Sequence, residues 1–182
     1  MHKNLPKKYY FIKSFDKNHI KSLSKNIALI FRDYNKNHNY KQILNIKNYC
    51  LSNKRIFFLS NNLKLAIKLD LDGVYIPSFN KSLSIKNIKL KKKFIVLGSA
   101  HNIKEIRTKE KQGVDAIFLS SLFSKKKNYL GLNKFLNLSK LTKKKIIALG
   151  GVNKSNIKKL KMLDVYGFAA ITYFDKKKGP YK

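Results

Sequence analysis

Cysteine, long apolar runs and acidic residues are all scarce in this chain of 182 residues. Cys50 is the one cysteine, which excludes an internal disulfide and favours a reducing compartment, so we expect a cytoplasmic protein. No apolar run approaches the roughly 18 residues that a membrane-spanning helix needs, so we expect no membrane partner. The residues before Tyr9 contain no apolar segment of the kind that signal peptides have, and no signal peptide is expected.

The shortage of acidic residues leaves a very basic chain. Only 9 Asp and Glu residues stand against 41 Lys and Arg, which gives a formal net charge of +32. Such a charge usually indicates nucleic-acid binding. Here the lysines are spread over nearly every segment, and they occur with many Asn and Ile residues, as an AT-rich genome would favour. Because no platform of aromatic and basic residues is visible, we expect no specific nucleic-acid partner, only non-specific adhesion at low salt.

Size and apolar content predict one folded domain over residues 1–182, since 43% of the residues are hydrophobic. Short apolar runs alternate with helical patterns along the chain. The predicted strands are 9–12, 27–31, 56–59, 73–76, 94–97, 116–119, 146–149 and 167–171. The predicted helices are 18–24, 40–50, 63–69, 102–113, 132–141 and a last one capped by Asn153, with an irregular segment at 79–90.

This alternation predicts the α/β class and a small (β/α)8 TIM barrel whose last helix is truncated or missing. The alternative is an open, doubly wound sheet. A weak internal repeat supports the barrel: Leu71-Asp72-Gly73-Val74, Val114-Asp115-Ala116-Ile117 and Val165-Tyr166-Gly167-Phe168 each lead from a helix end into a strand. A truncated last unit would leave apolar surface that a second subunit would cover, so a homo-oligomer is one expectation.

In such a barrel the functional residues lie in the loops that follow the strands. The glycine pair Gly150-Gly151 follows one strand directly, and glycines let backbone N–H groups approach an anion closely. The loops also supply Arg, Ser, Lys and His side chains. These features predict an anion site, although a glycine pair also serves ordinary tight turns and a lysine run is often only a solvated loop.

Several of these segments together resemble the thiamine phosphate synthase family, which includes the TenI-type thiazole tautomerases. The segments are Ser99-Ala100-His101, Leu119-Ser120-Ser121-Leu122-Phe123-Ser124-Lys125-Lys126 and Ala148-Leu149-Gly150-Gly151-Val152. Ile30-Phe31-Arg32-Asp33 falls where the family has its strand-two arginine motif, and the resemblance extends from about Tyr9 to Phe174. The order and spacing of the segments carry the resemblance.

The resemblance implies an enzyme that joins hydroxymethylpyrimidine diphosphate to thiazole phosphate and expels pyrophosphate. It implies catalytic roles for His101, Ser99 and Arg32. The substrate- and phosphate-binding residues that it implies are Arg32, Ser60, Lys125, Lys126, Gly150, Gly151, Ile171 and Thr172. Its cofactor would be Mg²⁺, but the two positions that carry the magnesium-binding Asp residues are Asn61 and Asn80 here. Neutral amides bind Mg²⁺ far less tightly than carboxylates do.

The resemblance leaves two other functions open. A TenI-type tautomerase moves a proton within a thiazole phosphate without a metal, and that branch uses a histidine where this chain has His101. The end of strand four at Pro77-Ser78 is also similar to that branch. The third function is a catalytically lapsed barrel that only binds phosphorylated ligands. For His101 itself, the alternative to a catalytic role is that of a capping or core histidine.

Overall fold

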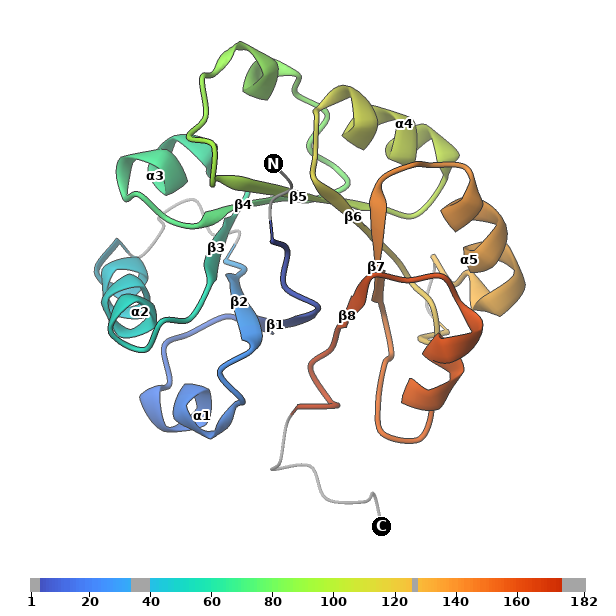
Figure 1. The fold of residues 1–182 in the computed structure, drawn as a ribbon, viewed down its shortest axis with the longest axis horizontal. Helices are drawn as coiled ribbons and strands as arrows, with labels where there is room; N and C mark the ends of the chain where they lie inside the picture. The colour runs from blue at the N-terminus through green and yellow to red at the C-terminus, as the bar shows by residue number, and fades with distance from the viewer. Residues whose placement is uncertain (1–3, 34–39, 126–127, 175–182) are drawn as a thin grey trace.

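The computed structural model describes residues 4–33, 40–125 and 128–174. Eight parallel strands close into a barrel in the order of the sequence, and the helices lie around its outside (Figure 1). The strands are β1 (Lys8–Ile12), β2 (Ile27–Phe31), β3 (Phe57–Ser60), β4 (Gly73–Ile76), β5 (Ile95–Ala100), β6 (Ala116–Leu119), β7 (Lys145–Leu149) and β8 (Gly167–Ala169). The predicted (β/α)8 barrel is therefore confirmed.

Pairing between the first and last strands rules out the alternative of an open sheet. Lys8 of β1 pairs with Phe168 of β8, and Tyr9 pairs with Ala169. Each strand is a short run of residues buried on both faces, as all five residues of β2 are, and this is what a parallel sheet covered by helices requires.

Five α-helices and two 3₁₀ helices surround the described barrel. They are α1 (Lys17–Ser22), α2 (Tyr40–Ser52), α3 (Leu63–Lys68), η1 (Ser84–Asn87), α4 (Ile103–Lys111), α5 (Gly131–Lys140) and η2 (Ile157–Met162). Asparagine or aspartate side chains cap α1, α3 and α4, as Asn102 does by accepting the N–H of Glu105 at 3.0 Å. Within the described ranges, none of the helices has the length and apolar character needed to cross a membrane.

The segment after β7 differs from its predicted form. Asn153 does not cap an α-helix, because its side-chain oxygen accepts the N–H groups of Ser155 and Asn156 in a turn. A 3₁₀ helix, η2, begins only at Ile157. Strand β8 ends at Ala169, two residues earlier than predicted, and residues 171–174 form a turn. Among the residues described after β8, up to position 174, no helix covers the gap between α1 and η2 (Figure 1).

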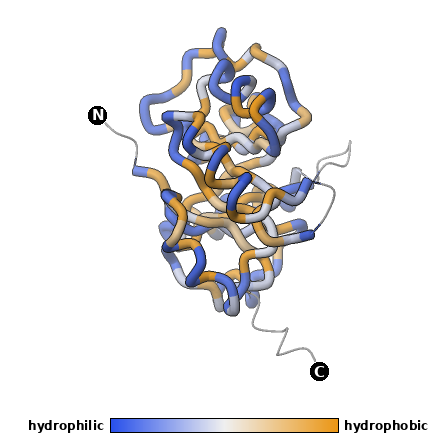
Figure 2. Tube along the Cα trace, turned by 90° about the vertical axis from the view of Figure 1, so that its right-hand side faces the viewer, coloured by the Kyte–Doolittle hydropathy of each residue, from blue (hydrophilic) through white to orange (hydrophobic). Residues whose placement is uncertain are grey.

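Aromatic rings fill the barrel interior. Tyr9, Phe11, Tyr75 and Phe118 pack in T-shaped pairs, with the centroids of Tyr9 and Phe118 4.9 Å apart and those of Tyr75 and Phe118 5.3 Å apart. Such pairs contribute about 0.5–1.5 kcal/mol each beyond the burial of their area. A second apolar core lies between the strands and the helices, and Figure 2 shows the apolar chain inside and the polar chain outside.

The internal repeat has a structural explanation at the amino ends of the strands. The carboxylate of Asp72 accepts the N–H of Phe57 at 2.8 Å, and that of Asp115 accepts the N–H of Val96 at 2.7 Å. Each aspartate thus ties the start of its own strand to the start of the strand before. The third copy has Tyr166 in this place, and its hydroxyl donates instead to the carbonyl of Leu5 at 2.7 Å.

Candidate active site

The predicted site residues that the structure describes lie at one end of the barrel, in the last residues of the strands or in the loops that follow them. All strands are parallel, so the segments that follow them meet at the carboxyl ends, which we call the mouth. Arg32 follows β2, Asn61 follows β3 and Asn80 follows β4. His101 follows β5, and the glycine pair follows β7. Lys126, which the resemblance also assigned to the site, lies outside the described residues.

Two asparagines from neighbouring loops touch at the mouth. The Asn80 side-chain amide donates to the side-chain oxygen of Asn61 at 2.7 Å. Asn61 holds this position with a left-handed backbone, at φ 58°, and its N–H donates to the carbonyl of Tyr75. The side-chain oxygen of Asn80 accepts the N–H of Ser82 at 3.0 Å. The resemblance to the family assigns Asn61 and Asn80 to one metal site, and the fold places these two residues in contact.

A buried lysine of α4 and the glutamine that caps the end of this helix hold the Asn80 segment in place. The Lys109 ammonium donates to the carbonyls of Pro77 and Asn80, both at 2.8 Å, and to the side chain of Gln112 at 2.8 Å. Gln112 donates in turn to the carbonyls of Asn80 and Ser82. Lys109 is fully buried, and this burial lowers its pKa to about 8, against a weaker opposing effect of Glu105.

Arg32 and two serines form the wall of the mouth. The Arg32 guanidinium lies over the ring of Phe11, 4.8 Å from its centroid, and remains partly exposed. This cation–π contact orients the group while leaving its N–H donors for an anion. Ser60 and Ser99 are the buried polar residues of β3 and β5. Their hydroxyls therefore belong to the wall and not to its open rim.

His101 is held by a carboxylate of the helix that follows it, α4. Its ring Nδ1 lies 2.9 Å from Oε2 of Glu105, and the same oxygen accepts the backbone N–H of His101 at 2.7 Å. With Nδ1 bonded to a carboxylate, Nδ1 carries a proton and Nε2 is the nitrogen left to exchange one. His101 is partly exposed at the start of α4, so it is neither a core residue nor the cap, which is Asn102.

The glycine turn packs tightly on the loop after β6. Gly150 and Gly151 have φ values of 101° and 77°, and the carbonyl of Gly150 accepts the N–H of Phe123 at 2.8 Å. A Cβ atom on Gly151 would lie 2.6 Å from the backbone nitrogen of Ser124. Close approach of two backbones therefore requires glycine here, whether or not an anion binds. Lys125, Ile171 and Thr172 are exposed around this turn.

Magnesium fits these residues poorly. The two amide oxygens of the asparagine pair already accept hydrogen bonds, and both side chains are neutral. Within the described ranges, no three His, Cys, Asp or Glu side chains gather as a metal-binding group. Mg²⁺ is a hard cation that is normally bound through one or two carboxylates, so the donor set at Asn61 and Asn80 does not suit it.

Fold and site together define a class, a (β/α)8 barrel with a glycine turn and polar side chains gathered at the carboxyl ends of its strands. Residues 19–174 match the family model described as thiamine monophosphate synthase. The chain belongs to this family, and the resemblance seen in the sequence is confirmed.

Individual proteins that are similar to this chain carry the name of the same family. The chain is 30% identical over 132 residues to the thiamine-phosphate synthase of Methanococcus vannielii. The aligned residues cover 70% of this chain and 63% of that protein. It is 27% identical over 139 residues to a putative thiamine-phosphate synthase 2 of Aquifex aeolicus, with 74% of each covered. The chain spans about three-fifths of the length of the first curated relatives that it matches.

Solved structures share the barrel. Thiamine phosphate pyrophosphorylase from Pyrococcus furiosus superimposes with a TM-score of 0.74 at 20% identity, over 91% of this chain and 85% of that one. A structure described as native KDPGal superimposes with a TM-score of 0.65 at 12% identity, over 93% and 85%. At these identities the likeness shows the fold.

Sequence reasoning missed three residues that shape the mouth. Glu105 lies three residues after the helix cap Asn102, a spacing that indicates only a capping role, and its contact with His101 depends on the ring turning back toward the helix. Lys109 and Gln112 gave no signal as polar residues of a surface helix. The one available sign was the position of Lys109 three residues after Ile106, on the face of α4 that is buried.

Proposed function

We propose that the chain is a thiamine phosphate synthase-like transferase of thiamine biosynthesis. It would join hydroxymethylpyrimidine diphosphate to thiazole phosphate and release pyrophosphate. The observation that carries the proposal is the family match over residues 19–174 on a barrel with a polar mouth. The single, buried and free Cys50 fits a reducing cytoplasm as the place of action.

Cationic and backbone groups of the mouth would do the work on the substrates. Departure of pyrophosphate requires that its developing charge be neutralised. Arg32, oriented by Phe11, suits this role, because a guanidinium binds phosphate oxygens with two parallel hydrogen bonds. Lys125 adds an exposed ammonium in the loop after β6. The glycine turn and Thr172 would bind the phosphate of the thiazole at the ends of β7 and β8.

The asparagine pair provides the test of this proposal. We expect slow condensation by the natural chain, and faster condensation at lower Mg²⁺ in the double variant Asn61→Asp with Asn80→Asp. The two side chains touch, so two carboxylates would repel each other until a cation binds between them. Mg²⁺ should therefore raise the melting temperature of the double variant, a readout that needs no substrate.

A matched control introduces the same two negative charges at a site remote from the mouth. Asn45→Asp with Asn48→Asp places two carboxylates on the exposed side of α2. It should change neither the condensation rate nor the response to Mg²⁺. Fast condensation by the natural chain in EDTA would contradict the proposal, and so would a double variant that gains neither rate nor Mg²⁺ response.

His101 favours a second function, the metal-free tautomerase reaction. Its ring is fixed by Glu105 with one nitrogen left for proton transfer, as a general acid–base requires. In this case His101→Gln should lower turnover of the thiazole substrate by about 10²–10⁴-fold while phosphate binding stays. EDTA should have no effect. Binding of thiazole phosphate without turnover of either substrate set would instead identify a catalytically lapsed barrel.

A further inference from the structure

The opposite end of the barrel carries a pocket that the proposed function does not use. It has a volume of about 450 Å³ and lies where the amino ends of β1, β2 and β3 meet. Its walls include four lysines, which are Lys7, Lys8, Lys25 and Lys54. Its floor is apolar and includes Leu5, Ala28 and Ile56, which lie where the barrel interior meets the amino ends of the strands. No Asp or Glu is among the described residues that line it.

A buried arginine makes one wall of this pocket rigid. Arg55 donates to the carbonyls of Leu23, Ser24 and Ile27 at 2.8 to 2.9 Å. These bonds fix the turn between α1 and β2, which carries Lys25, against the start of β3. In the same turn the Ser24 hydroxyl donates to the side-chain oxygen of Asn26 at 2.9 Å, which fixes the side chain of a residue that lines the pocket.

Lys54 occupies a backbone position that usually belongs to glycine. It follows the end of α2 with φ 51°, and its N–H donates to the carbonyl of Leu51 at 3.2 Å. A glycine is favoured at such a helix end because a Cβ there is strained. Replacing Lys54 by glycine would therefore remove the ammonium and relieve the backbone, so that loss of binding cannot be attributed to loss of the fold.

We propose that this pocket binds an organic di- or triphosphate, with its phosphates among the four lysines and its ring on the apolar floor. The Lys7 ammonium lies over the ring of Tyr166, 6.0 Å from its centroid, and no carboxylate lies among the lining residues to offset the positive charge of the lysines. A multiply charged anion would remove the repulsion among these lysines. A pocket of this volume exceeds what a single phosphate needs and lies within the range of small-molecule sites. The class of ligand is that of the nucleoside diphosphates and triphosphates, at the end of the barrel remote from the mouth.

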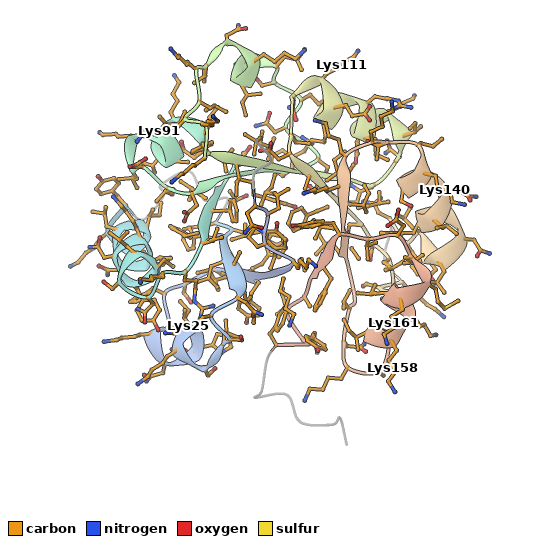
Figure 3. The ribbon with its side chains drawn as sticks, in the orientation of Figure 1. Lys25, Lys91, Lys111, Lys140, Lys158 and Lys161 are labelled. Carbon is orange, nitrogen blue, oxygen red and sulfur yellow. The ribbon has the colours of Figure 1, made fainter. Side chains whose placement is uncertain are left out.

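Calorimetric titration with ATP, pyrophosphate and adenosine at about 0.15 M ionic strength tests this site. ATP should bind saturably, pyrophosphate more weakly, and adenosine alone should not bind measurably. The variant Lys25→Gln with Lys54→Gly should weaken ATP binding by about tenfold or more, because it removes two charge-assisted contacts. Lys158→Gln with Lys161→Gln on η2 is the matched control and should leave binding unchanged (Figure 3).

Two results would overturn the proposal. Equal loss in both double variants would mean general attraction of anions to a basic chain. Loss of ATP binding in Arg32→Gln, but not in Lys25→Gln with Lys54→Gly, would place the ligand in the mouth. Neither ATP nor adenosine is a substrate of the proposed reaction, so the ATP result does not depend on whether the chain carries out the condensation. Pyrophosphate is the product of that reaction, so only the part of its binding that Lys25→Gln with Lys54→Gly removes counts for this pocket.

Discussion

Gly151 is required by the fold and also belongs to the phosphate site that we propose. Its positive φ and the backbone of Ser124 each exclude a side chain. We expect Gly151→Ala to lower the free energy of unfolding by about 2–3 kcal/mol, from the strained φ plus the collision. It should also weaken thiazole-phosphate binding by moving the turn. Chemical denaturation and titration calorimetry measure the two effects.

Gly113 provides the control for this substitution. It also has a positive φ, at 73°, but a Cβ there would meet nothing within 4 Å. Gly113→Ala should therefore cost only the backbone strain, about 1 kcal/mol, and leave ligand binding unchanged. Equal destabilisation by the two substitutions would show that the contact with the β6 loop does not matter.

At the scale of elements, α4 is the helix that organises the mouth. Its first residues follow the loop that carries His101, and its buried face holds the segment between β4 and β5 through Lys109 and Gln112. The mouth thus depends on a helix whose central contact is an ammonium group surrounded by carbonyl oxygens. This contact has a measurable dependence on pH.

The substitution Lys109→Met tests the contact between the Lys109 ammonium and the carbonyl groups around it. The substitution keeps the apolar stem but leaves the carbonyls of Pro77 and Asn80 without their buried donor, so we expect a loss of about 2 kcal/mol at neutral pH. The pKa of Lys109 is about 8 in the folded protein against 10.5 ordinarily, so the unfolded chain binds more protons between these values. The stability of the natural chain relative to Lys109→Met should therefore rise from pH 8 to pH 10.5. Urea denaturation across this range measures the difference, and a difference that stays flat or falls contradicts the assigned burial.

The elements that the sequence predicted well are those whose apolar runs admit one interpretation. Strand β2 is apolar at all five positions, and only burial on both faces suits such a run. The segment after β7 was predicted wrongly because Ile157, Leu160 and Leu163 are spaced by three, which fits a 3₁₀ helix as well as an α-helix.

The candidate site was less predictable, because its contacts join loops distant in the sequence. The resemblance to a family placed Asn61 and Asn80 at the mouth, but their hydrogen bond depends on the path of both loops. Lys109 escaped notice because lysine is normally exposed, and only its carbonyl partners make its burial tolerable.

At the scale of the whole molecule, the excess of positive charge opposes the folding of the chain into a compact state. Lysines lie around the entire perimeter, as the six labelled ones do in Figure 3, and the net charge is +32. Mutual repulsion among them destabilises the folded chain, and salt screens it. Raising NaCl from about 20 mM to about 300 mM should therefore increase the melting temperature by about 5 °C or more. Calorimetry measures the shift, sucrose serves as an uncharged control, and a melting temperature that falls with salt would contradict the prediction.

Because β1 pairs with β8, one edge of the first strand stays unpaired until the last strand has been synthesised on the ribosome. The Leu5 carbonyl meets its partner, the Tyr166 hydroxyl, across 161 positions of sequence. At about 5–20 residues per second, one edge of β1 waits about 10–30 s for the strand that will cover it. During that time the nascent chain exposes an unpaired strand edge, which is the feature that holdase chaperones protect and that promotes aggregation. Slower translation of the second half would lengthen this exposure, so yield on expression should depend on elongation rate as well as on folded stability.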